Sequence, residues 1–345
     1  MNKALKGIAI ACVMLVAASI QARSGREALT YMEKISKPTE KIPIDMWDYI
    51  RSAAHSKNAV QVENKRRSLI QNVAAVRAAT ARQPGFDGDT TFRDSLVHYL
   101  TTLHIILTED YGKIVDMEEV AEQSYDAMEA YLLAKEKANV KMNEAAEAFR
   151  KAEEEYASKH NIKLIYTESE VSKNLKKAGE VMAHYNQVYL IFFKSYKQEL
   201  YLLDALNKQD MGKFEQNRLA LAKTTDKGLD LLDDIDDYNG DDSLLEACEE
   251  YLEFANKEAE EHLKIVSEFQ SKQEQFEDIK RAFEAKKQSE RTQKDVDLYN
   301  AKVKEVNDAS HRYNNMMDQL NQNRSRLIDF WNKSGTRFFE RHVPK

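Results

Sequence analysis

The distribution of proline is the feature that most restricts what this 345-residue chain can fold into. Its four prolines are Pro38, Pro43, Pro84 and Pro344, so residues 85–343 contain none. Proline interrupts helices because its ring removes a backbone donor and clashes with the preceding turn. With 42% hydrophobic and 32% charged residues, the chain has enough apolar side chains for a core and too many charges for a membrane bundle. A mainly helical protein is therefore expected.

Apolar side chains recur every three or four residues in three long segments, which places them on one face of a helix. The segment 117–156 predicts one continuous helix, and the aromatic-rich segment 185–203 predicts a helix packed in a bundle core. The segment 296–331 alternates steps of three and four, as in a coiled coil. Arg324 lies on this seam, so we expect its stem along the seam and its guanidinium in water or on a carboxylate. The predicted fold class is all-α, with long antiparallel helices in two related helical-bundle units and coiled-coil-like packing.

The amino end has the layout of a secretory signal peptide. Lys3 and Lys6 precede an apolar stretch that is too short to span a bilayer, and small residues follow it. Cleavage is expected after Ser19 or after Ala22, and removal of the two lysines takes the net charge from −7 to −9. The mature chain then keeps one cysteine, Cys248, for which we predict a buried apolar role. The predicted location is exported, either periplasmic or at the cell surface, with secretion an open alternative.

An internal repeat with an offset of 152 residues relates the two halves of the chain. The overlay matches Gly88-Asp89 with Gly240-Asp241, so that two predicted interhelical turns coincide. It also matches Glu63 and Arg66 with Glu215 and Arg218. The predicted organisation is a signal peptide over residues 1–22, a first helical unit over 23–165 and a second over 166–345.

Motifs that carry chemistry are missing from the sequence. It contains no phosphate-binding loop, HExxH zinc motif, CxxC pair or GxSxG elbow, and none of its eight histidines has Glu three residues earlier, as a di-iron bundle requires. Glu258 and His262 are spaced for one helical face, and we expect a surface contact between them rather than a ligand pair. The prediction is no enzyme, no catalytic residues and no cofactor. A net charge of −9 also argues against a nucleic-acid partner.

One acidic segment resembles an EF-hand calcium loop. Residues 235–246 match at several ligand positions, and the candidate ligands are Asp237, Asn239, Asp241 and Glu246. The loop departs from the pattern at Ile235, where calcium loops have Asp, and at Asp242, where they have an apolar residue. An interhelical turn with N-caps explains the same residues without a metal, and binding of a cation there stays open.

Several strings of this sequence resemble a family of exported surface proteins that occurs in leptospires and widely in Bacteroidetes. The strings are His160-Asn161-Ile162-Lys163-Leu164, Glu109-Asp110-Tyr111, Ile114-Val115-Asp116-Met117-Glu118-Glu119, Tyr189-Leu190-Ile191-Phe192-Phe193-Lys194-Ser195-Tyr196-Lys197-Gln198-Glu199, Trp331-Asn332-Lys333 and His342-Val343-Pro344. The resemblance implies export and surface exposure and supplies no catalytic residues. Some members are lipoproteins with a cysteine directly after the signal, and this chain lacks that cysteine.

Taken together, the sequence predicts an exported non-enzymatic helical protein of the periplasm or surface, acting as a binding or structural module. Its partner would be a protein or another component of the cell envelope, and the mature chain is predicted to have no transmembrane segment. The alternative is a cryptic metal-dependent hydrolase whose site is assembled between helices, which motifs would not reveal. A deep polar cleft that holds two or more facing acids or histidines would favour this alternative.

Overall fold

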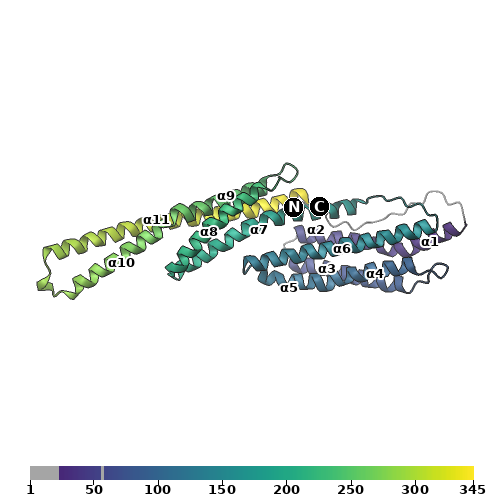
Figure 1. Ribbon diagram of the computed structural model, residues 1–345, viewed down its shortest axis with the longest axis horizontal. Coiled ribbons are helices and arrows are strands. Elements are labelled where there is room, and N and C mark those ends of the chain that lie inside the picture. Colours follow the sequence, from purple (N-terminus) through teal and green to yellow (C-terminus); the bar gives the residue numbers. More distant parts are fainter. Residues whose placement is uncertain (1–22, 56–57) are drawn as a thin grey trace. The chain divides into compact units, whose positions relative to one another are not determined.

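A computed structural model describes residues 23–55 and 58–345 of the chain. The predicted signal peptide and its cleavage sites, residues 1–22, lie outside the described residues. Within the described part every regular element is helical, and the only β-pairing is two isolated bridges. The all-α prediction is confirmed, and helices adjacent in sequence pack antiparallel (Figure 1).

Contacts divide the described residues into two compact units, unit 1 (those up to Gln187, with Thr336–Lys345) and unit 2 (Val188–Gly335). The boundaries fall within helix α7 (Glu170–Asn207) and helix α11 (Gln293–His342). The division predicted from the sequence lies at residue 165/166, in the segment that precedes α7. Each unit is described below by itself.

Unit 1 begins with α1 (Arg23–Ser36), the short 3-10 helix η1 (Lys37–Glu40) and α2 (Lys41–His55), followed by α3 (Ala59–Ala81). Next, α4 (Thr91–Ile105), the π-helix η2 (Ile106–Asp110) and α5 (Tyr111–Ala121) form one uninterrupted helical run. This run packs along α6 (Tyr125–Lys159). Aromatic rings fill the core between this run and α6, where Phe92 stacks on Phe149 and on Tyr156 at ring-centroid distances of 5.9 and 4.9 Å.

The single helix predicted over 117–156 is wrong, because the chain breaks between α5 and α6. Ser124 has extended backbone angles, and its hydroxyl accepts a hydrogen bond from the backbone N–H of Ala127 at 3.2 Å. This is an N-cap, which satisfies one of the free donors of a new helix. The apolar spacing continues on both sides of the break, which is why periodicity alone did not reveal it.

Unit 2 contains α8 (Met211–Asp233), α9 (Ser243–Lys257), the π-helix η3 (Glu258–His262) and α10 (Lys264–Ala285). A short 3-10 helix, η4 (Gln288–Glu290), connects α10 to α11. The seam predicted on α11 lies on its protected face, since Leu320, Arg324, Leu327 and Trp331 are buried. Cys248 is a free thiol with no exposed surface, as predicted, and burial raises its pKa.

The 152-residue interval recurs between elements of the two units. Helices α3 and α8 both have 23 residues, α4 and α9 both have 15, and the π-helices η2 and η3 both have five. Each of these pairs starts 152 positions apart. Both 23-residue helices also start with the same kind of cap, in which Asn58 accepts from Gln61 N–H and Asp210 from Lys213 N–H, each at 3.1 Å.

Candidate functional site

Unit 2 contains a buried cluster of charged side chains, formed by Glu199, Tyr251, Glu258 and Arg324 and called the charged cluster below. The four residues come from α7, α9, the first position of η3 and α11, respectively. The side chains of both glutamates have 0% exposed surface, and that of Arg324 has 9%. Charged side chains are almost never this buried unless they are paired.

Arg324 binds both carboxyl groups at once. Its Nε donates to Glu199 Oε1 at 2.6 Å, and its Nη2 donates to Glu258 Oε1. The remaining guanidinium nitrogen, Nη1, donates to Asn321 Oδ1 at 2.6 Å. The second oxygen of Glu199 accepts the hydroxyl proton of Tyr251 at 2.5 Å. The head of Arg324 therefore lies on carboxylates, one of the two positions expected from the sequence.

Aromatic rings pack against Tyr251, one member of the charged cluster. Phe192 on α7 stacks on Trp331 of α11 with centroids 4.3 Å apart and contacts the Tyr251 ring at 4.7 Å. Tyr196, one turn further along α7, stacks on Phe192 at 5.9 Å. Because these charged side chains are buried, the charges lie in a medium of low dielectric constant, where an unpaired charge is costly.

The electrostatic balance of the charged cluster shifts the pKa of its members. Burial, followed by the hydrogen bond and charge of Glu199, raises the pKa of Glu258 to about 9, against an opposing effect of Arg324. Burial and the neighbouring Glu199 also raise the pKa of Tyr251 far above its ordinary value. Burial alone would lower the pKa of Arg324, but the negative charges of Glu199 and Glu258 outweigh it, and the pKa is raised.

Both units contain a π-helix, and each π-helix is bound by an arginine of a 23-residue helix. This helix is α3 for η2 and α8 for η3. A π-helix replaces the usual i→i−4 hydrogen bonds by longer ones, and such segments are frequent at functional sites. Arg66 donates from Nη1 to the carbonyl of Leu107 in η2 at 2.8 Å, and Arg218 donates to the carbonyl of Ala259 in η3 at 2.6 Å. Glu63 and Glu215 orient these arginines through ion pairs within one helical turn.

The expected surface pair of Glu258 and His262 is wrong. Glu258 has no exposed surface, whereas His262 is half-buried. Glu258 follows the buried Tyr251 by seven residues, which places it on the buried face, and its Oε1 accepts from Arg324 Nη2.

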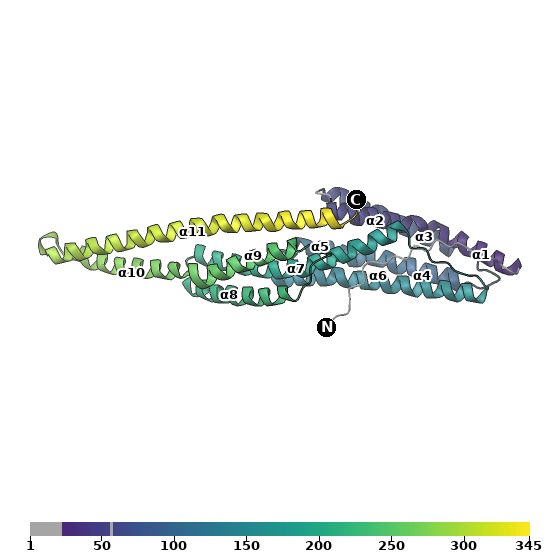
Figure 2. The same ribbon diagram turned by 90° about the horizontal axis from the view of Figure 1, so that it is seen from above.

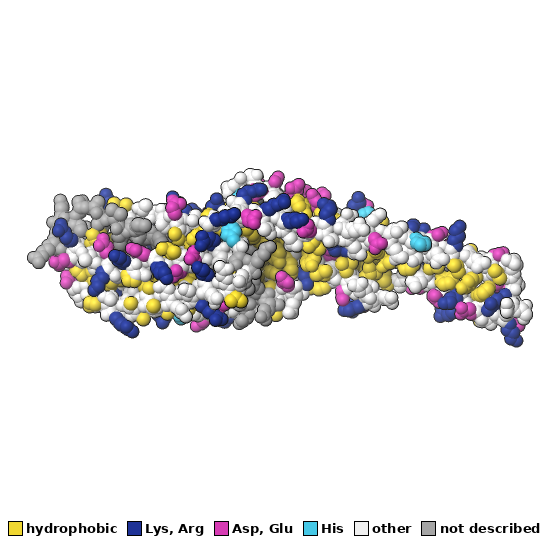
Figure 3. All heavy atoms as spheres, turned by 180° about the vertical axis from the view of Figure 1, so that it is seen from behind, with side chains coloured by type: hydrophobic (Ala, Val, Ile, Leu, Met, Phe, Trp, Pro, Cys, Tyr) yellow, Lys and Arg dark blue, Asp and Glu magenta, His cyan; other side chains and the backbone are white. Residues whose placement is uncertain are grey.

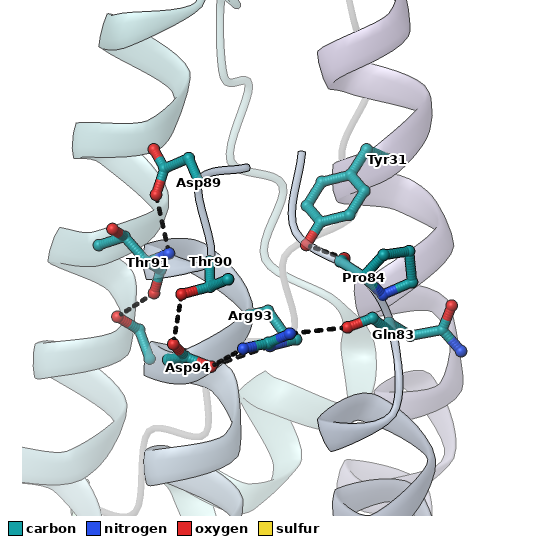
Figure 4. Close-up of polar contacts among 9 residues, drawn as sticks. Tyr31, Gln83, Pro84, Asp89, Thr90, Thr91, Arg93 and Asp94 are labelled. Carbon is teal, nitrogen blue, oxygen red and sulfur yellow. Dashed lines mark hydrogen bonds and ion pairs between the residues drawn. The ribbon is translucent and has the colours of Figure 1, made fainter. Parts of the chain in front are cut away.

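The first interhelical turn, between α3 and α4, is stabilised by a network of polar contacts (Figure 4). Phe86 and Asp89 exchange two backbone hydrogen bonds of 2.9 and 2.8 Å, and Asp89 Oδ1 accepts the N–H of Thr91 at the start of α4. Arg93 donates to the carbonyl of Gln83 at 2.8 Å and pairs with its neighbour Asp94. The side-chain contact of Lys159 and the bonds from Thr91 lower the pKa of Asp89.

The second interhelical turn contains the candidate calcium ligands. Asp237 accepts the backbone N–H of Gly240, Asp241 accepts that of Ser243 at 3.1 Å, and Asn239 has a positive φ of 56°. Glu246 lies in the first turn of α9. Carboxylates in this turn therefore accept backbone hydrogen bonds, and within the described residues no group of three or more His, Cys, Asp or Glu side chains could hold a metal ion.

Comparisons with family models, curated proteins and solved structures returned no match to this chain. Among residues 23–55 and 58–345, no helix has an apolar stretch that could cross a bilayer.

Sequence reasoning identified Arg324 but missed its two acidic partners. A usable signal was present, because Glu199 follows the buried Phe192 by seven residues and Glu258 follows the buried Tyr251 by seven. A spacing of seven keeps residues on one helical face, so both acids are expected on the buried faces of their helices.

Proposed function

We propose that the protein is an exported, non-enzymatic binding or structural module of the periplasm or cell surface. The observation that supports this proposal most is a two-helix projection, made of α10 and the first part of α11 and called the α10–α11 hairpin below. Residues 267–308, all of which the structure describes, include no buried residue. A segment of this length that adds nothing to a core presents most of its surface to other molecules.

The α10–α11 hairpin is held together by its own aromatic contacts. Phe269 stacks on Tyr313 at 5.0 Å, and Tyr299 contacts Phe276 at 5.8 Å and Phe283 at 4.7 Å. Figure 2 shows the two helices side by side, and Figure 3 shows apolar side chains along them, flanked by acids and bases. These rings are half-buried, as expected when two helices pack without a third.

Ion pairs across the hairpin fix its register. Lys272 pairs with Glu305 at 3.3 Å, and Arg312 pairs with Glu268 at 2.9 Å. At the tip, Lys286 pairs with Asp295 at 2.7 Å. Exposed pairs contribute little stability each, so their main effect is to define one alignment of the two helices. A defined surface with mixed charge suits recognition of a protein or another envelope component.

The alternative function, a metal-dependent hydrolase with a site between helices, gains one observation. Glu199 and Glu258 face each other with a raised pKa on Glu258, and paired carboxyl groups are a common catalytic arrangement. However, Arg324 already binds Oε1 of both glutamates, and both side chains have no exposed surface. A metal ion or substrate would need to displace this arginine, so the charged cluster supports a structural role better.

A deletion within the α10–α11 hairpin tests the proposal. Residues 276–301 would be replaced by a short glycine-rich turn, which joins the helices where Lys302 contacts Gln275. We expect the intact mature chain to retain a partner from envelope extract and the shortened chain to retain at least tenfold less. Fluorescence of Trp331, which is buried in unit 2, checks that the remainder of unit 2 is folded.

Equal capture by the intact and shortened chains would refute a role of the hairpin in binding. The hydrolase alternative is separated by calorimetric titration with zinc, manganese and magnesium, using Glu258→Gln as the matched variant. Metal binding that is present in the wild-type chain and lost in the variant would favour the enzyme and overturn the non-enzymatic proposal.

A further inference from the structure

The charges of the charged cluster do not balance when both acids are ionised. Two carboxylates face one guanidinium, which leaves a net charge of −1 among side chains with almost no exposed surface. Burying an uncompensated charge costs far more than burying a neutral hydrogen-bonded group. A folded unit 2 therefore needs either a second cation or a proton at this position.

The hydrogen bonds show where a proton would be held. Glu199 accepts from Arg324 and Tyr251, so both of its oxygens have donors. Glu258 accepts from Arg324 on Oε1, whereas its buried Oε2 has no donor. We propose that Glu199 and Glu258 bind one proton between them, carried on Glu258 Oε2 and donated to the Glu199 carboxylate, and that folding of unit 2 depends on this proton.

The groups on neighbouring elements support this assignment. Arg218 on α8 is engaged by Glu215 and by the Ala259 carbonyl, so it does not neutralise the pair. On η3 itself, Glu260 and Glu261 are exposed acids and His262 is half-buried. The groups that act on Glu258 directly are Glu199 from α7 and Arg324 from α11, and the neutral Tyr251 from α9 lies beside them. The raised pKa of Glu258 agrees with a neutral carboxyl group at pH 7.

The pH dependence follows from proton linkage. The pKa of Glu258 is raised above that of an unfolded glutamate, so the folded chain keeps a proton that the unfolded chain releases. Its stabilising contribution is complete below the unfolded pKa and is lost as the pH rises toward about 9. Between about pH 5 and pH 8, the unfolding constant of unit 2 should rise about tenfold per pH unit because of this proton.

Glu258→Gln tests the proposal, because a glutamine amide can donate to Glu199 as a protonated carboxyl does. Both chains carry Trp47→Phe, so that Trp331 alone reports urea unfolding of unit 2. The slope of the logarithm of the unfolding constant against pH gives the number of protons released on unfolding. We expect this number to be smaller by one in Glu258→Gln. The matched control, Glu260→Gln, changes an exposed acid of the same π-helix and should keep the wild-type slope.

Equal slopes in the wild-type chain and Glu258→Gln would overturn the proposal. If the variant does not fold, carbon-13 NMR of the Glu258 carboxyl in the wild-type chain replaces it. A titration midpoint above pH 7 supports the shared proton, and a midpoint near the ordinary glutamate value refutes it. The result does not depend on whether the chain binds a partner, so it is independent of the proposed function.

Discussion

The α3–α4 helix pair of unit 1 and the α8–α9 pair of unit 2 share their backbone details but bury different chemistry. Corresponding helices of the two pairs have equal lengths. Each pair also has a turn with two consecutive positive-φ residues, a following π-helix and an arginine bound to a π-helical carbonyl. At 152 positions before Glu199 and Glu258, unit 1 has Trp47 and Ile106, and both are buried. The acids of the charged cluster thus occupy positions that are apolar in unit 1.

This difference shows that the backbone geometry does not depend on what the core contains. Caps and turns are local interactions, and they recur, together with the arginine contact to the π-helix, with either an apolar or a charged interior. The charged interior, in contrast, depends on Arg324, which comes from a helix more than sixty positions further along the chain. Unit 2 should therefore be more sensitive than unit 1 to loss of one distant side chain.

The largest effect is expected for Arg324→Ala. The substitution leaves buried carboxyl oxygens without their cation, and breaking a buried pair in this way costs about 3–5 kcal/mol. Urea unfolding followed by Trp331 in the Trp47→Phe background measures the loss in unit 2. Arg326→Ala is the matched control, since this exposed arginine only approaches Glu250 at 3.6 Å and should change stability by less than about 1 kcal/mol. Similar losses in the two variants would contradict the buried role of Arg324.

A second effect concerns Glu153, a buried acid of α6 in unit 1. Burial, with a smaller contribution from Glu154, raises its pKa to about 7, so the folded chain holds a proton that the unfolded chain releases. Stability of unit 1 should fall by about 1 kcal/mol per pH unit between pH 5 and pH 7, and this slope should disappear in Glu153→Gln. Trp47 in a Trp331→Phe background reports unit 1. Glu155→Gln, at an exposed neighbouring position, should keep the slope, and a slope that persists in Glu153→Gln would refute the assignment.

The arginines at the π-helices provide a test of equivalence between the units. Arg66→Met and Arg218→Met each remove a charged donor from a buried carbonyl, which should cost about 2 kcal/mol in either unit. Arg67→Met is the control, because the Arg67 side chain is 69% exposed and pairs with Glu63, the same acid that pairs with Arg66. Single-tryptophan unfolding would measure both losses. If stability falls in only one unit, the shared backbone geometry does not give the two arginine contacts equal stabilising effects.

Much of the fold follows from local patterns in the sequence. The proline-free stretch and the apolar spacing predict long helices, and Gly-Asp at both interhelical turns predicts where two of them end. The break at Ser124 was missed because a capped junction can preserve the apolar spacing across it. Periodicity reports which face is buried, and it does not report whether the backbone is continuous.

The charged cluster was only partly predictable for a different reason. The stripe on α11 identified Arg324 as an exception to an apolar seam, but its partners come from α7 and η3. The spacing of four to His262 predicts a surface position for Glu258, whereas Arg324 binds this glutamate in the core. Long-range pairing and irregular helical turns depend on tertiary packing, which no local pattern specifies.

The smallest expected effect tests the two turns themselves. Asp87 and Gly88 have φ values of 48° and 80°, and Asn239 and Gly240 have 56° and 80°, as in a type I′ turn. No atom lies within 4 Å of a Cβ added at either glycine, so alanine would cost only backbone strain of about 1 kcal/mol in each unit. Gly112→Ala on α5 is the matched control, since it also has open space but a helical backbone, and it should stabilise by about 0.5–1 kcal/mol. Because both turns impose the same conformation, a cost at Gly240 without one at Gly88 would mean that the acidic surroundings of the second turn, and not its backbone, determine its stability.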